Sequence, residues 1–165
     1  MVTPDNTNIT DTIIIEFSKT IEMFGLTPLE ARLFTYLYLS GEALTLDEMS
    51  EALGKSKTSM STNIRSLSEL NLVTRVWRKG IRKDLYKANS QLFKTFMNSY
   101  ISRWLEATNQ QHDGLEDIKQ QIEVECKENS ITSEQKQLIN RLDNILYFHT
   151  QIEKLFNEMN QNINK

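Results

Sequence analysis

An unbroken heptad pattern near the end of the chain limits what this sequence can fold into. A helix with such a seam must pack against another helix, because its apolar stripe is too long to remain in water. Thr132 and Gln135 have the spacing of a capping box and predict where this helix begins. The seam keeps alternating spacings of four and three over 26 residues, at Leu138, Leu142, Ile145, His149, Ile152, Phe156, Met159 and Ile163.

A second long helix is expected immediately before it, over residues 91–127, and Asn129 and Ser130 are expected to end it. With only five glycines and two prolines in 165 residues, most of the chain is expected to be helical. The two long helices predict either dimerisation, in which they and the N-terminal helix pair with a second copy, or an intramolecular hairpin with no partner chain. The apolar stripe expected on the earlier helix is Phe93, Met97, Tyr100, Trp104, Leu115, Ile118 and Ile122.

Two capping signals organise the first half of the chain. Thr27 and Glu30 have the spacing at which a threonine caps a helix and the glutamate reaches back to complete the box. Thr45 and Glu48 repeat this spacing. The helices predicted from these signals span residues 28–39 and 46–53.

An earlier helix is expected over residues 8–24. Its apolar positions recur at spacings of four, four and three, and Gly25 is expected to end it. The predicted buried face consists of Ile13, Phe17, Ile21 and Phe24.

A helix-turn-helix outline lies between residues 46 and 70. Gly54 ends the short helix, residues 55–57 form the turn, and a new helix is expected over residues 58–70. The outward face of this new helix is small, polar and cationic, as in helices that enter the major groove of DNA. An ordinary amphipathic helix would show the same pattern, so both interpretations stay open at this point. The candidate DNA-binding residues are Lys55, Lys57, Thr58, Ser59, Ser61, Thr62, Asn63 and Arg65.

A basic hairpin is expected to follow this helix. Residues 73–78 and 81–87 are predicted strands, with Lys79-Gly80 at the turn and Trp77 stacked beneath the hairpin. Helix, turn, helix and basic hairpin is the order of a winged helix, in which the wing contacts the DNA backbone or the minor groove. The candidate DNA-binding residues of the wing are Arg78, Lys79, Arg82 and Lys83.

The distribution of charge favours double-stranded DNA as a partner, although the net charge is -3. Residues 1–54 contain nine acidic and two basic residues, whereas residues 55–87 contain nine basic and two acidic ones. A local concentration of positive charge attracts phosphates even when the whole protein is acidic. The alternative is a solvated cluster of surface cations, which nine bases within one short segment make the weaker interpretation.

No motif of a catalytic or metal site occurs in the sequence. His112 and His149 have no partner at metal-ligand spacing, and no phosphate-binding glycine loop or nucleophile elbow is present. We therefore expect a protein that is not an enzyme and that binds no metal and no cofactor other than a small effector. The absence of a signal-peptide pattern and of a long apolar run predicts a cytoplasmic protein that does not enter a membrane.

Residues 26–90 resemble the winged helix-turn-helix of the MarR superfamily and, within it, the GbsR-type repressors. The resemblance is carried by GKSKTSMSTNIRSLSELNLV at the second helix of the motif and by VWRKGIRKDLYKA at the wing. It implies a mainly α fold with a small β-hairpin wing, in which residues 26–90 form the DNA-binding domain. Residues 1–25 would form an N-terminal dimerisation helix, and residues 91–165 a C-terminal helical dimerisation region.

The resemblance further implies a homodimeric repressor that binds a palindromic operator. This repressor would sense choline or glycine betaine and would control genes for the uptake or synthesis of osmoprotectants. The faces of aromatic rings hold a quaternary ammonium group, which offers little hydrogen bonding. The candidate effector-binding residues are Tyr36, Tyr38, Phe93, Phe96, Tyr100 and Trp104. The same rings also have the spacing of core and dimer contacts, and this alternative stays open.

A different class of function also remains open from the sequence. The winged helix and the helical arms would equally suit a protein-interaction module that has no enzymatic activity. The two interpretations differ in salt dependence, because only binding to DNA phosphates releases condensed counterions.

Overall fold

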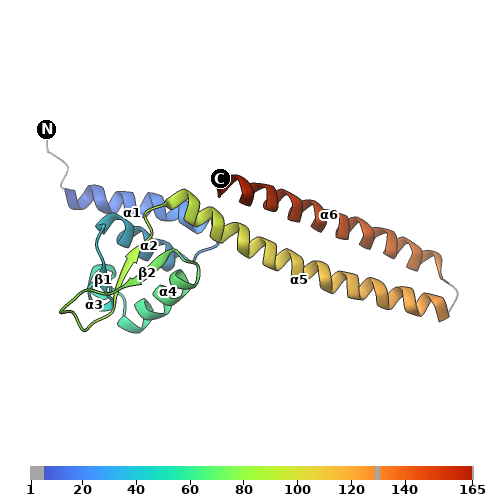
Figure 1. Ribbon diagram of the computed structural model, residues 1–165, viewed down its shortest axis with the longest axis horizontal. Helices are drawn as coiled ribbons and strands as arrows, with labels where there is room; N and C mark the ends of the chain where they lie inside the picture. Colours follow the sequence, from blue (N-terminus) through green and yellow to red (C-terminus); the bar gives the residue numbers. More distant parts are fainter. Residues whose placement is uncertain (1–5, 129–130, 165) are drawn as a thin grey trace. The chain divides into compact units, whose positions relative to one another are not determined.

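The computed structural model describes residues 6–128 and 131–164 and shows a mainly helical chain with one small sheet (Figure 1), which confirms the predicted fold class. The chain divides into two compact units, residues 1–99 and 100–165. The break predicted at Asn129 and Ser130 lies outside the described residues. The elements are α1 (Asn6–Glu22), α2 (Pro28–Ser40), β1 (Leu44–Thr45), α3 (Leu46–Leu53), α4 (Lys57–Glu69), β2 (Val73–Val76), β3 (Leu85–Ala88), α5 (Leu92–Glu128) and α6 (Ser133–Ile163).

Reciprocal side-chain caps begin three of these helices. At the start of α2, Thr27 Oγ1 accepts a hydrogen bond from the Glu30 N–H at 3.3 Å, and the Glu30 carboxylate accepts one from the Thr27 N–H at 2.8 Å. Thr45 and Glu48 make the same pair of bonds at the start of α3, at 3.3 and 2.7 Å. A third box begins α6. All three predicted capping boxes are therefore confirmed. Each box satisfies backbone amide groups that the start of a helix leaves unpaired.

Three short antiparallel strands form a sheet in the order β1-β3-β2. The central strand β3 pairs on both sides, since Leu85 lies opposite Val76 of β2 and opposite Thr45 of β1. The sequence did not predict β1, because a strand of two residues has no alternating pattern to recognise.

The wing differs from the predicted hairpin. Its strands end at Val76 and resume at Leu85, so residues 77–84 form a loop in place of a two-residue turn at Lys79-Gly80. Within this loop, the Ile81 N–H donates to the Arg78 carbonyl at 3.1 Å. The predicted strand lengths were wrong, because alternation of basic and apolar residues continues beyond the last paired residues.

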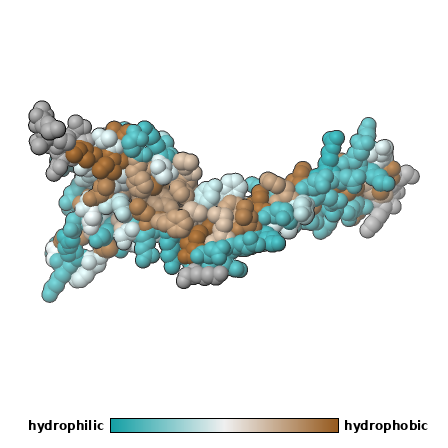
Figure 2. Space-filling model, turned by 90° about the horizontal axis from the view of Figure 1, so that it is seen from above, coloured by the Kyte–Doolittle hydropathy of each residue, from teal (hydrophilic) through white to brown (hydrophobic). Residues whose placement is uncertain are grey.

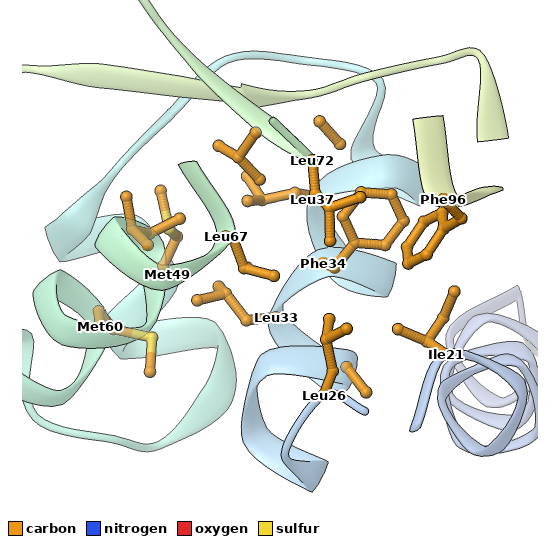
Figure 3. Packing of buried hydrophobic residues seen from close by; sticks show 14 residues of the cluster. Ile21, Leu26, Leu33, Phe34, Leu37, Met49, Met60, Leu67, Leu72 and Phe96 are labelled. Carbon is orange, nitrogen blue, oxygen red and sulfur yellow. The ribbon is translucent and has the colours of Figure 1, made fainter. Parts of the chain in front are cut away.

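A hydrophobic core joins α2, α3, α4 and the sheet within the first unit (Figure 3). At its centre the fully buried ring of Phe34 meets Phe96 of α5 edge to face, with ring centroids 4.9 Å apart. Met49 of α3 and Met60 and Leu67 of α4 are also fully buried. Each such side chain contributes roughly 1.5–3 kcal/mol of hydrophobic stabilisation. The core therefore fixes the inward face of α4 and leaves its opposite face to solvent.

The buried face of α1 is rotated from the predicted one. Ile14 and Ile21 are buried, and Ser18 between them donates a hydrogen bond to the Thr35 hydroxyl of α2 at 3.4 Å. Ile13, which was predicted to be buried, is 43% exposed. Three consecutive isoleucines occupy different faces of this helix, so the apolar spacing alone could not identify the face that meets α2.

In the second unit, the remainder of α5 and α6 lie side by side as a helical hairpin (Figure 1). The rings of Trp104 and Phe156 stack with centroids 5.6 Å apart and planes inclined by 18°. Further along, the Lys119 ammonium lies 2.8 Å from the Asp143 carboxylate. The long helix pair expected from the sequence is therefore present.

The predicted seam of α6 is only partly correct. Leu142 is buried, but Leu138 and Ile145 are exposed, and Leu146 occupies the second buried position. The predicted stripe of α5 needs a similar correction, since Phe93 is 71% exposed. These helices carry more apolar residues than one facing helix can cover. A second apolar stripe of α6 is consequently exposed, at Leu138, Ile145, Phe148 and Leu155.

Candidate nucleic-acid interface

The turn between α3 and α4 determines where the candidate recognition helix α4 begins. Gly54 has a φ of +62°, a left-handed conformation that glycine adopts without strain, and it ends α3. Ser56 then accepts a hydrogen bond from the Ser59 N–H at 3.2 Å and caps α4. The helix therefore begins at Lys57, one residue earlier than predicted. Lys55 and Lys57 lie exposed at this end, where the helix dipole adds partial positive charge.

The outward face of α4 carries the polar residues predicted to contact DNA. Thr58, Thr62 and Arg65 are exposed, while Ser59, Ser61 and Asn63 are half-buried. Thr62 Oγ1 donates to the Thr58 carbonyl at 3.1 Å, and Asn63 Nδ2 donates to the Ser59 carbonyl at 2.8 Å. Asn63 retains a second N–H and its carbonyl oxygen, which are the groups that pair with an adenine edge. Arg65 and the threonines are thus presented directly, and Asn63 after a side-chain rotation.

The loop of the wing, residues 77–84, presents its four predicted cations to solvent. Arg78, Lys79, Arg82 and Lys83 are all exposed. Gly80, with a φ of +86°, provides the conformation that this turn requires. Trp77 is 82% exposed, so the expectation that it stacks beneath the wing is wrong. Since β2 ends at Val76, Trp77 lies outside the strand, and the alternation of side chains between the two faces of the sheet does not extend to it.

Three of the predicted DNA-binding cations are paired with carboxylates of the same chain. Lys57 Nζ lies 2.8 Å from Asp47 Oδ1, and Lys83 Nζ lies 2.7 Å from Asp47 Oδ2. Arg78 lies 3.6 Å from a Glu42 oxygen. Hydrogen bonds from Lys57 and then Lys83 lower the pKa of Asp47 to about 2, so this carboxylate is ionised at neutral pH.

Other cations of the same surface are not engaged in this way. Within residues 6–128 and 131–164, the structure shows no ion pair for Lys55, Arg65, Lys79 or Arg82. An exposed cation of this kind is available to a phosphate without first losing an internal partner.

A groove of about 240 Å³ lies among the start of α3, the start of α4 and the wing loop. Segments far apart in the sequence therefore bring charged side chains to one place. An ion pair between Arg75 and Asp84 links β2 to the end of the loop beside it. The lining residues are Leu46, Asp47, Lys57, Arg82, Lys83 and Asp84.

The six aromatic residues predicted to bind an effector are divided between the two units. Phe96 is buried in the core of the first unit, and Tyr38 stacks on Phe34 with centroids 6.2 Å apart. In the second unit, Tyr100 and Trp104 both pack against Phe156. Phe93 is exposed and is not among these ring contacts.

Tyr36 has a different setting from the other five. It lines a groove of about 680 Å³ formed by α1, α2 and α3, together with Asp11 and Arg32. An aromatic ring, a carboxylate and a guanidinium group therefore border one space in the first unit.

The sequence did not identify Asp47 as part of this surface. Its position in the first turn of α3 is common for an acid, because negative charge there favours the helix dipole. Its partner Lys83 lies 36 residues later, a separation that no local spacing rule covers. The one sequence feature that could have predicted an ion pair for Asp47 is the concentration of nine basic residues in residues 55–87. An acid that folds close to so many cations is expected to pair with one of them.

The described residues contain no group of three or more His, Cys, Asp or Glu side chains arranged to hold a metal ion. No helix among them combines the length and the apolar composition needed to cross a membrane.

Comparisons with known proteins agree with this geometry. A model of the MarR family matches residues 24–78. The chain is 31% identical over 149 residues to the HTH-type transcriptional repressor GbsR of Bacillus subtilis (strain 168), covering 88% of this chain and 82% of that protein. It is 27% identical over 134 residues to the HTH-type transcriptional repressor OpcR of the same organism, covering 81% and 72%.

The fold is shared more widely than the sequence. A crystal structure of a transcriptional regulator is similar with a TM-score of 0.52 at 17% identity, covering 92% of this chain and 98% of that one. The helix-turn-helix, the wing and the sequence similarity together show that the chain belongs to the MarR family, in its GbsR-type group.

Proposed function

We propose that this protein is a homodimeric transcriptional repressor that binds double-stranded DNA through α4 and the wing. The observation that carries the proposal is the groove where Lys57 of α4 meets Arg82 and Lys83 of the wing, beside the exposed polar face of α4. GbsR and OpcR are themselves transcriptional repressors, which supports the same role here. A repressor works where the chromosome lies, so we place this protein in the cytoplasm.

The two parts of the surface have different tasks in this proposal. The face of α4 enters the major groove, where Asn63 and Arg65 read base edges. The wing cations contact phosphates, which fixes the position of the protein on DNA without selecting a sequence. The same division predicts which substitutions change site preference and which change affinity alone.

The exposed apolar residues of the helices support a homodimer. Figure 2 shows hydrophobic side chains at the surface over α1 and along the helical hairpin. On α6, Leu138, Ile145, Phe148 and Leu155 follow spacings of seven, three and seven, which is the pattern of a stripe that packs against another helix. A second copy of the chain would cover this stripe. Two-fold symmetry would then match a palindromic operator.

We also propose that the effector is choline or glycine betaine and that it binds in the groove lined by Tyr36, Asp11 and Arg32. The face of the tyrosine ring and the carboxylate suit a quaternary ammonium group, and the guanidinium suits the carboxylate of glycine betaine. Since α1, α2 and α3 all border this groove, a bound ligand would act on the position of the helix-turn-helix. The genes controlled would then be those for uptake or synthesis of osmoprotectants.

The DNA-binding proposal is tested by capture of genomic fragments on the purified protein at low salt, followed by sequencing. We expect enrichment of a few palindromic sites and loss of the captured DNA as salt is raised. Capture of no DNA at low salt would contradict the repressor and favour a module that binds protein.

The effector proposal is tested by thermal unfolding and DNA binding in the presence of each solute. We expect choline or glycine betaine to raise the melting temperature and to change DNA affinity, because a ligand that controls DNA binding must prefer one state of the protein. Arg32→Gln should abolish the response to glycine betaine and leave any response to choline. Ligand binding that leaves DNA affinity unchanged would contradict the sensing role.

A further inference from the structure

Asp47 connects the two parts of the DNA-binding surface. Its two carboxylate oxygens pair separately with Lys57, the first residue of α4, and with Lys83 of the wing loop, at 2.8 and 2.7 Å. Lys57 and Lys83 are exposed and the Asp47 side chain is 43% exposed, so a phosphate approaching this surface has direct access to both lysines. One carboxylate thus pairs with two of the cations that line the groove, one from α4 and one from the wing loop.

The charge of this cluster is smaller than its two lysines suggest. The ammonium groups of Lys57 and Lys83 and the carboxylate of Asp47 together carry a net charge of +1. A DNA phosphate that approaches them therefore meets one anion as well as two cations. A carboxylate and a phosphate offer lysine the same kind of anionic oxygen acceptor. Each ammonium has three N–H donors, so a lysine that binds DNA either leaves Asp47 or bonds the phosphate while its charge is partly balanced by Asp47.

The start of α3 does not depend on Asp47 for its cap. The reciprocal hydrogen bonds of Thr45 and Glu48 already form the capping box. The Asp47 side chain turns instead toward the two lysines, and Lys83 lies on a loop 36 residues away. The cap of α3 is therefore complete without Asp47, whose charge in the first turn still favours the helix dipole.

We propose that Asp47 competes with the DNA backbone for Lys57 and Lys83 and so limits the sequence-independent affinity of this surface. The proposal rests on the DNA-binding function proposed above and adds an affinity-setting residue to it. The consequence for a repressor is faster release from non-specific DNA, because less of the binding comes from phosphate contacts that every sequence offers.

The test compares Asp47→Asn with Glu51→Gln, using a fluorescent duplex of arbitrary sequence and anisotropy titrations at several salt concentrations. Both substitutions remove one negative charge from α3, but Glu51 has no ion pair within the described part of the chain. It lies one helical turn beyond Asp47 and is exposed, so it controls for the general effect of charge.

For Asp47→Asn we expect, per engaged DNA-binding domain, about eightfold tighter binding at 0.1 M salt and a log–log salt dependence steeper by about 0.9, the value for one additional neutralised phosphate. Glu51→Gln should change affinity by less than about twofold and leave the slope unchanged. Weaker binding by Asp47→Asn would overturn the proposal and make Asp47 a positioning residue for the lysines. Equal effects of the two substitutions would also overturn it.

A second comparison asks whether the effect passes through the lysines. In a Lys57→Gln, Lys83→Gln background, Asp47→Asn should change affinity no more than Glu51→Gln does in the same background. A persisting eightfold gain would show that Asp47 acts elsewhere. The outcomes remain separate from those of the repressor proposal, because failure of the unsubstituted protein to bind any duplex would contradict DNA binding itself.

Discussion

The ammonium group of Lys83 lies 2.7 Å from the carboxylate of Asp47, a residue 36 positions earlier in the chain. This ion pair ties the loop of the wing to the first turn of α3. Because Asp47 also pairs with Lys57, the wing and the start of α4 present their cations as one surface. We therefore expect contact with DNA phosphates to depend on both elements at once.

Base recognition is expected to reside in α4. Asn63→Ala and Arg65→Ala should each alter the ranking of captured genomic sites, with a loss of roughly 1–3 kcal/mol of discrimination for each bidentate base contact removed. Selection of sites from a random duplex library by each variant measures this ranking. Thr74→Ala, at an exposed position of β2, serves as the control and should leave the ranking unchanged. An unchanged ranking for both α4 variants would place the reading surface elsewhere.

The ion pairs of Asp47 predict a specific dependence of stability on pH. The lysines lower the pKa of this carboxyl from 3.8 to about 2. A depressed pKa stabilises the folded state above the unfolded value, and this stabilisation is lost as the pH falls toward the folded value. The difference in free energy of unfolding between the unsubstituted protein and Asp47→Asn should be constant above about pH 5 and shrink between about pH 4 and pH 2.

Urea unfolding at a series of pH values measures that difference. Comparing two variants cancels the titration of the other carboxylates, which both proteins share. If the difference stays the same from pH 5 to pH 2, Asp47 gains no stabilisation from the two lysines.

Local and long-range features of this chain were not equally predictable from the sequence. The capping box of Thr45 and Glu48 depends on hydrogen bonds between residues three apart, so its spacing alone identified it. The partnership of Asp47 with Lys83 depends on how the wing folds back on α3, and no spacing predicts it. The candidate cations of α4 and the wing could be named from the sequence because charge concentrates there, and the structure shows that they are exposed.

The faces of the long helices were the least predictable feature. Leu138, Leu142 and Ile145 all belong to the heptad pattern, yet only Leu142 of these is buried. The other buried apolar residue of α6 is Leu146, which lies outside the pattern. Both apolar stripes of α6 have the spacing of a helix face. The sequence therefore does not show which of them packs against α5. The position of Trp77 was not predictable for a similar reason. It lies one residue beyond the last paired residue of β2, and its side chain is exposed.

The exposed stripe of α6 predicts a substitution that should prevent the proposed dimer. Ile145→Lys places a charge on the stripe and should yield monomers, measured by light scattering after gel filtration, because an unpaired charge is not tolerated in an apolar interface. Asn140→Lys adds the same charge at an exposed position on a different face of α6 and should remain dimeric. A dimer that withstands Ile145→Lys would show that another surface joins the two copies.

Trp77 predicts an optical signal of DNA binding. The chain has two tryptophans, so Trp104→Phe leaves Trp77 as the only one. Its indole is 82% exposed beside the wing cations, and we expect duplex DNA to shield it from acrylamide quenching. Trp77→Phe, which reports on Trp104 alone, should show no such shielding. Equal quenching of Trp77 with and without bound DNA would indicate that this part of the wing stays away from the duplex.

Salt dependence of duplex binding in the unsubstituted protein and in Lys79→Ala, Arg82→Ala tests the central claim most directly. These two wing cations have no ion pair among the described residues, so each is free to neutralise one phosphate. We predict affinity that falls steeply as salt rises, and a log–log slope shallower by about 1.8 per engaged DNA-binding domain in the double variant. An unchanged slope, or binding that does not respond to salt, would contradict the assignment of the wing to DNA.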